Sequence, residues 1–187
     1  MGILKIGVFA GSLRRESFSG KIAGIVADML PEDLQVKTVD IGGLVLYNQD
    51  YDDQGAPPRE WAAFRQEIAS LDGFLFVTPE YNRSMTPALK NALDIGSRPF
   101  GQNLWSGKPG ALISISQGQL GGFGANHHLR QTMSFLNILL LSQPEAYIGN
   151  VASLLNGRGE PANQSTKNFL QEYAGAFALW VRRFARP

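Results

Sequence analysis

Five short apolar runs alternate along the chain with segments whose apolar residues recur at helical spacing. Nearly continuous apolar runs are typical of strands that are covered on both faces. Strands that alternate with helices in this way form parallel, doubly wound sheets. The pattern therefore predicts a single α/β domain over residues 1–187. Its five strands are expected at Ile3–Ala10, Leu34–Ile41, Phe74–Val77, Gly110–Ser116 and Ile138–Leu141.

Helices are predicted where apolar residues recur every three or four positions. The helix after Thr86 has the clearest start, because Thr86 can act as its N-cap and Pro87 stands at the first helical position. A long irregular stretch, residues 42–58, is expected to be functional or interfacial, since such loops are uncommon inside compact domains. The remaining helices are expected at Ser17–Leu30, Arg59–Leu71, Asn126–Phe135 and Thr166–Phe184.

The first predicted strand runs into a loop rich in serine and arginine, Gly11–Ser19. Open α/β sheets bind ligands at the carboxyl ends of their strands, and the following helix offers free amides and a positive dipole end. Ser12, Ser17 and Ser19 add hydroxyl donors, and Arg14 can hold a phosphate with two parallel hydrogen bonds. We expect a phosphate monoester here, since the G-x-G-x-x-G motif is absent. A serine-capped helix start with solvated arginines is the alternative.

Two further polar loops follow the third and fourth predicted strands. Pro79–Ser84 is expected to be an extended loop along the edge of a planar ring, with Tyr81 beside the ring and Asn82 as a hydrogen-bonding amide. Glycines in Ser116–Gly124 permit a ligand to approach the backbone closely. A polar turn and a flexible surface loop are the respective alternatives. The three loops meet at the switch point of a flavodoxin-like strand order, so together they predict a site for flavin mononucleotide (FMN).

Composition excludes several other classes of protein. Lys and Arg number 17 against 16 for Asp and Glu, so the net charge of +1 gives no basis for nucleic-acid binding. Cys is absent and the two histidines, His127 and His128, are adjacent, so no metal site is expected. The N-terminal apolar run is too short for a membrane span and lacks the plan of a signal peptide. We therefore expect no membrane association and a cytoplasmic location.

The segments GSLRRESFS and TPEYNRSMTPALKNALDIGSRP resemble the signature segments of the NADPH-dependent FMN reductases, specifically of the bacterial chromate and quinone reductase branch. The resemblance extends over essentially the whole chain. It implies a flavodoxin-like three-layer sandwich with a five-stranded parallel sheet and bound FMN. It also implies hydride transfer from NADPH or NADH through FMN to a quinone, chromate or a similar small-molecule acceptor. The implied assembly is a homodimer or homotetramer in which a neighbouring subunit completes the flavin pocket.

Matched residue by residue, the resemblance assigns the cofactor contacts to the three loops. It implies no catalytic acid or base, because the flavin carries the chemistry. Arg98 corresponds to a basic residue near the open flavin face and Arg83 adds positive charge, so both are expected to orient substrates. His127 and Glu145 match positions at the subunit contact. The expected cofactor-binding residues are Ser12, Arg14, Ser17, Phe18, Ser19, Pro79, Glu80, Tyr81, Asn82, Ser84, Ser116, Gln117 and Gly118.

A flavodoxin-like electron carrier that binds FMN without oxidising a pyridine nucleotide is the competing interpretation. Such carriers tend to be strongly acidic for docking to a protein partner, and the balanced charge of this chain disfavours that interpretation. Both NADH and NADPH are compatible with the sequence, as are dimers and tetramers.

Overall fold

A six-stranded parallel sheet forms the central layer of the computed structural model, which describes residues 2–185. The strand order is β2-β1-β3-β4-β5, and β6 also pairs with β4. Because this is the strand order of flavodoxin, the predicted flavodoxin-like α/β architecture is confirmed. The strands are β1 (Leu4–Ala10), β2 (Leu34–Thr38), β3 (Gly73–Pro79), β4 (Pro109–Ile115), β5 (Leu139–Leu140) and β6 (Ala146–Ile148).

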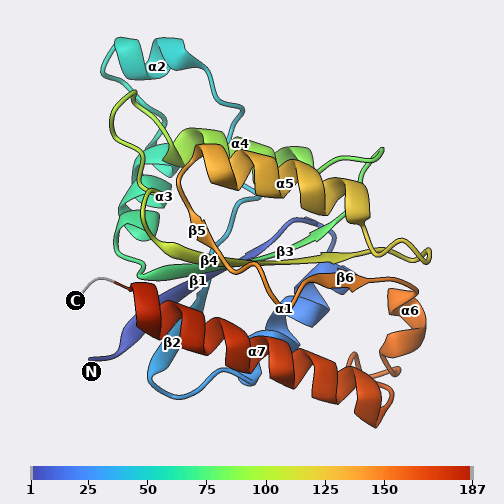
Figure 1. The fold of residues 1–187 in the computed structure, drawn as a ribbon. Coiled ribbons are helices and arrows are strands. Elements are labelled where there is room, and N and C mark those ends of the chain that lie inside the picture. The colour runs from blue at the N-terminus through green and yellow to red at the C-terminus, as the bar shows by residue number, and fades with distance from the viewer. Residues whose placement is uncertain (1, 186–187) are drawn as a thin grey trace.

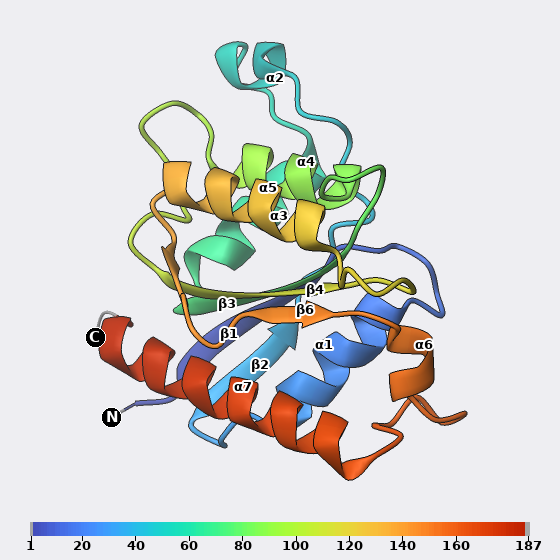
Figure 2. The same ribbon diagram turned by 45° about the vertical axis from the view of Figure 1, so that its right-hand side comes forward.

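Helices cover both faces of the sheet. Figure 1 shows α3, α4 and α5 on one face and α1 and α7 on the other, and the turned view in Figure 2 shows the same layers. Ile6 and Val8 of β1 pack toward α1 and α7, whereas Phe9 and Phe76 pack toward α3, α4 and α5. None of the helices within residues 2–185 is long and apolar enough to cross a membrane. The helices are α1 (Phe18–Asp28), α2 (Gln49–Asp53), α3 (Arg59–Ala69), α4 (Pro87–Gly96), α5 (Phe123–Phe135), α6 (Val151–Leu154) and α7 (Gln164–Phe184).

The edge of the sheet beyond β4 is divided between two short strands, where one was expected. β5 pairs with Pro109 and Gly110, whereas β6 pairs with Ile113–Ile115. Tyr173 of α7 fills the gap, because its hydroxyl accepts a hydrogen bond from the Leu112 amide and donates one to the Leu112 carbonyl, both at 2.9 Å. Burial raises the pKa of Tyr173 far above its usual range, so the hydroxyl keeps the proton that it donates.

The stretch predicted to be irregular, residues 42–58, contains the short helix α2 and is held by partly buried hydrogen bonds to α4. Asn91 of α4 accepts a hydrogen bond from the Tyr47 amide at 2.8 Å. The same side chain donates to the carbonyls of Leu44 and Val45 at 3.1 and 3.0 Å. The stretch therefore forms a fixed wall beside α4.

Two bidentate Arg–Asp ion pairs connect distant parts of the fold. Arg65 of α3 donates to both carboxylate oxygens of Asp52 in α2, at 2.6 and 2.7 Å. Arg182 in the last turn of α7 donates to those of Asp33 at 2.6 and 2.9 Å. The side chains of Asp52 and Arg65 are 4% and 13% exposed, against 39% and 32% for Asp33 and Arg182. The same chemistry thus occurs in a largely buried pair and in a partly exposed pair.

Candidate functional site

A cavity of about 180 Å³ opens at the carboxyl ends of β1, β3 and β4. The loops after these three strands line it, as the sequence predicted. Of the expected cofactor-binding residues, all except Asn82, Ser84 and Gly118 contribute to the wall. The lining consists of Ser12, Arg14, Ser17, Phe18, Ser19, Pro79, Glu80, Tyr81, Ile115, Ser116, Gln117 and Val151. We call this space the cofactor cavity.

One end of the cofactor cavity is rich in hydrogen-bond donors. Ser17 is the N-cap of α1 and its hydroxyl accepts from the Gly20 amide at 3.0 Å, so the helix begins at the cavity wall. The first amides of a helix have no partner within the helix. The Ser19 hydroxyl is buried and lacks a hydrogen-bond partner among residues 2–185, although it lines the cavity. Together with Arg14, these donors suit an anionic phosphate group, and the site therefore fits the phosphate end of FMN.

The loop after β3 forms a tight turn, not the extended loop that was predicted. Tyr81 and Ser84 exchange two backbone hydrogen bonds of 2.9 Å across it. The two residues between them, Asn82 and Arg83, have φ angles of 49° and 66°. Two successive residues in the left-handed region reverse the chain within two positions, which explains why Asn82 and Ser84 lie away from the cavity wall. We call Tyr81–Ser84 the ring-loop turn.

The loop after β4 is packed so closely that side chains could not be added at several glycines. Gly121 and Gly122 have φ angles of 59° and 73°. A Cβ at Gly121 would collide with the backbone of Tyr147, and one at Gly149 with the Gln119 carbonyl. At Gly122 a Cβ would lie 2.9 Å from the Ile115 carbonyl oxygen. Close packing against β6 therefore fixes the course of this loop past the cavity.

A buried polar chain supports the same loop from the α5 side. Ser114 of β4 donates to the Gly121 carbonyl at 2.7 Å, and Asn126 donates to the Ser114 hydroxyl at 3.1 Å. Arg130 in turn donates to the Asn126 side-chain oxygen at 2.8 Å. Ser114 and Asn126 are fully buried. These three linked hydrogen bonds hold the Gly121 carbonyl in place.

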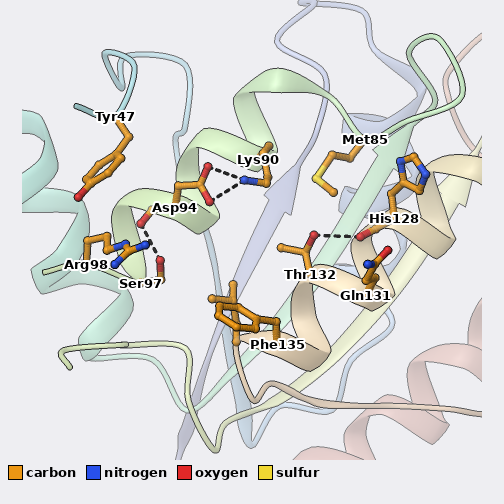
Figure 3. Close-up of a pocket in the computed structure, with 11 residues that line it drawn as sticks. Tyr47, Met85, Lys90, Asp94, Ser97, Arg98, His128, Gln131, Thr132 and Phe135 are labelled. Atoms are coloured by element: carbon orange, nitrogen blue, oxygen red, sulfur yellow. Dashed lines mark hydrogen bonds and ion pairs between the residues drawn. The ribbon is translucent and has the colours of Figure 1, made fainter. Parts of the chain in front are cut away.

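A separate groove of about 690 Å³ runs between α4 and α5. Figure 3 shows Tyr47, Ser97 and Arg98 at one end of it and Met85 and His128 at the other. Arg98 thus lines this groove and not the cofactor cavity of its own chain. The two ends are separated by the ten residues of α4, which span about 15 Å.

His127 and Glu145, which the family resemblance places at a subunit contact, lie in a surface cluster on α5 and beside β6. Tyr147 donates to Glu145 at 2.8 Å, and its ring stacks on His127 at a centroid distance of 6.0 Å. Phe123 packs against His127 at 4.1 Å. Burial, followed by the hydrogen bond to Glu145, raises the pKa of Tyr147. The cluster therefore presents a preformed aromatic surface beside the loop after β4.

A model of the NADPH-dependent FMN reductase family matches residues 4–153. The chain belongs to this family. A quinone reductase from Pseudomonas putida is 49% identical over 180 residues, which cover 96% of both chains. A 2-hydroxy-1,4-benzoquinone reductase from Burkholderia sp is 49% identical over 179 residues, 96% of this chain and 97% of that one. The solved structure of FerB, a flavoenzyme NAD(P)H:(acceptor) oxidoreductase from Paracoccus denitrificans, matches with a TM-score of 0.91 and 33% identity over 98% of this chain and 100% of that one.

Membership in the FMN reductase family confirms the family predicted from the two loop segments, together with the enzyme class and the FMN cofactor. The individual contacts to FMN remain predictions. Two residues outside the predicted set, Ile115 and Val151, also line the cavity. Ile115 is the last residue of an apolar strand and has no polar group that would suggest a ligand contact. Val151 follows a strand of three residues, which is too short to show a hydrophobic period.

Thr86 occupies the predicted N-cap of α4, and Pro87 is the first helical residue. The Thr86 hydroxyl makes no capping hydrogen bond. It is buried and has no partner within the part of the chain that the structure describes. It faces Gly11, where an added Cβ would lie 3.1 Å from the Thr86 Oγ1 atom. Gly11 therefore keeps the turn after β1 close to the start of α4 in this FMN reductase.

Proposed function

We propose that this protein oxidises NADH or NADPH and reduces quinones through bound FMN. The observation that carries the proposal is the cofactor cavity, in which Arg14, the buried Ser19 hydroxyl and the start of α1 face one space. Its similarity at 49% identity to proteins named quinone reductase and 2-hydroxy-1,4-benzoquinone reductase supports the choice of acceptor.

The protein binds and orients FMN and its substrates. FMN, when bound, supplies the ring that accepts hydride and passes two electrons to the acceptor. Ser12, Arg14 and Ser19 would hold the phosphate. The ring-loop turn and Gln117 would border the ring at the mouth of the cavity. Among the described residues that line the wall, Glu80 alone is acidic, and its carboxylate accepts hydrogen bonds from Arg83 and from the Ala125 amide. We propose no side-chain acid or base, because the flavin itself carries the chemistry.

Anaerobic mixing of the FMN-loaded protein with NADPH or NADH tests this function. We expect rapid bleaching of the flavin absorbance near 450 nm and its return when a benzoquinone is added. A flavodoxin-like electron carrier would show neither nucleotide-driven bleaching nor turnover with quinone. A steady-state panel with each nucleotide and with quinones, chromate and free flavin then ranks the acceptors.

Arg98 is proposed to act on the flavin of a second copy in a homodimer or homotetramer. Within its own chain it lies in the groove between α4 and α5, away from the cofactor cavity. Phe135 in the same groove and the nearby Phe100 are 88% and 91% exposed, which is typical of a surface that another chain covers. Chromate as a further acceptor and a cytoplasmic location are proposed from the resemblance of the loop segments alone.

Replacing Arg98 by alanine is expected to raise the KM for an anionic quinone about tenfold or more, because a hydrogen bond to a charged group contributes about 1.5–3 kcal/mol. Arg158→Ala, which removes an exposed guanidinium from the loop after α6, is the matched control. A sizing column reports the assembly of both variants. An unchanged KM in Arg98→Ala would contradict the proposed role, and a monomeric wild type would contradict action on a second copy.

A further inference from the structure

The N-terminus of α5 takes its capping acceptor from a different loop. Its N-cap, Gly122, has no side chain to offer. The Glu80 Oε2 atom accepts a hydrogen bond from the Ala125 amide at 3.2 Å. Ala125 is the third residue of α5, and a capping side chain ordinarily binds the second or third amide. Glu80, from the end of β3, therefore fills the place of an N-cap side chain.

The other oxygen of the same carboxylate binds the ring-loop turn. Glu80 Oε1 accepts from Arg83 Nη1 at 3.1 Å. Arg83 is one of the two residues of this turn in the left-handed region, where a long side chain is disfavoured. The Glu80 side chain is 11% exposed and that of Arg83 is 74% exposed. A shielded carboxylate thus connects the start of α5 to a strained turn.

Direct packing and a second side-chain contact reinforce this connection. A Cβ at Gly124, in the first turn of α5, would lie 2.6 Å from the Arg83 carbonyl oxygen and 3.0 Å from Glu80 Oε2. The turn can approach α5 this closely only because Gly124 has no side chain. Ser84 Oγ and His128 Nδ1 form a hydrogen-bonded pair of 2.9 Å one turn further along α5.

We propose that Glu80 is a positioning residue, whose carboxylate clamps the ring-loop turn to the N-terminus of α5 and so fixes the mouth of the cofactor cavity. The proposal rests on the FMN-dependent function given above and assigns one side chain of that site a role. Charge contributes as well as geometry, because a carboxylate is favoured at a helix N-terminus, which carries partial positive charge. Glutamine keeps an acceptor oxygen without the charge, whereas alanine removes both.

FMN affinity is the first measurement of the clamp, made by fluorescence titration of the apoprotein. We expect Glu80→Ala to weaken FMN binding about tenfold and Glu80→Gln about threefold, in line with the loss of a capping interaction. Glu172→Ala, which removes an exposed carboxylate from α7, is the matched control and is expected to bind FMN as the wild type does. Wild-type affinity in both Glu80 variants would overturn the proposal.

Two readouts separate positioning from a general loss of stability. In the apoprotein, hydrogen exchange at the Ala125 amide is expected to accelerate in Glu80→Ala, while amides of β3 keep their protection. In Glu80→Gln loaded with FMN, the midpoint potential is expected to shift to more positive values, because Glu80 lines the cavity and the variant removes its negative charge there. A purely structural role would leave the potential of bound FMN unchanged, and that result overturns the proposal.

These measurements use neither a pyridine nucleotide nor an acceptor, so they distinguish the clamp from the proposed function. A wild-type protein that fails to bind FMN contradicts the function, while the exchange rate of the Ala125 amide still tests the clamp. Conversely, normal FMN binding by the wild type together with unchanged exchange at the Ala125 amide in Glu80→Ala contradicts the clamp alone.

Discussion

Replacing Tyr173 by phenylalanine is expected to lower the free energy of unfolding by about 2–6 kcal/mol, although the ring stays in place. The hydroxyl is the partner of both the amide and the carbonyl of Leu112 in the middle of β4. Its removal leaves both backbone groups buried and unsatisfied, and each such group costs about 1–3 kcal/mol. Neither β5 nor β6 can take over, because their pairing with β4 ends on either side of Leu112.

Urea denaturation of the apoprotein, followed by circular dichroism, measures this loss. Tyr51→Phe is the matched control, because the ring of Tyr51 is partly exposed on α2 and water can solvate its hydroxyl. We expect its midpoint to stay near that of the wild type. If the two variants unfolded at the same urea concentration, the Tyr173 hydroxyl would not be what bridges the gap in the sheet.

Asp52→Asn is expected to destabilise the protein by about 3–5 kcal/mol, the range measured when one partner of a buried ion pair is removed. The variant leaves the Arg65 guanidinium largely shielded from water and without its bidentate partner. Arg65 also donates to the Ile95 carbonyl at 3.0 Å, so its displacement would disturb the end of α4. Loss of protection against proteolysis within residues 42–58 should accompany the change in stability.

Asp33→Asn breaks a pair of the same geometry in a more exposed position and is therefore the control for the effect of burial. Its effect at pH 7 should be much smaller, because solvent screens the charges. The hydrogen bond from Arg182 lowers the pKa of Asp33 below its ordinary value of 3.8. The contribution of this pair is therefore fully present above pH 3.8 and is lost as the pH falls through the lowered value. Equal losses in the two variants at pH 7 would show that burial does not set the contribution of these pairs.

The alternation of apolar runs and helical stripes predicted the sheet and its three loops, because a strand covered on both faces has a distinct local pattern. The same reasoning missed β6, whose three residues show no period and which is held by pairing with Ile113–Ile115. It also missed α2, which is anchored by Asp52 to a residue of α3. Both elements depend on partners that are distant in sequence.

The sequence predicted those parts of the candidate site that directly follow a strand. It did not predict the parts that depend on contacts between segments distant in sequence. Residues in the loop after β1 line the cofactor cavity as expected, since Ser17 starts α1 at the strand end. The ring-loop turn was predicted to be extended because proline suggested stiffness. Asn82 is of a type that tolerates the left-handed region, but Arg83 gives no such signal, so the pair of left-handed residues was missed. The contact between Glu80 and Ala125 joins the loop after β3 to the start of α5, 45 positions apart in the sequence, and leaves no local sequence pattern.

The glycines of the loop after β4 define where this enzyme can be redesigned. A Cβ added at Gly121 or Gly122, or at Gly149 after β6, would lie within 3.0 Å of backbone atoms, which cannot easily move away. A library that randomises these three positions would therefore yield mostly misfolded protein. At Gly118 an added Cβ would meet no atom within 4 Å, and its backbone has no conformation reserved for glycine. Directed evolution of acceptor range should therefore place its diversity at Gln117 and Gly118, on a loop whose remaining course is already fixed.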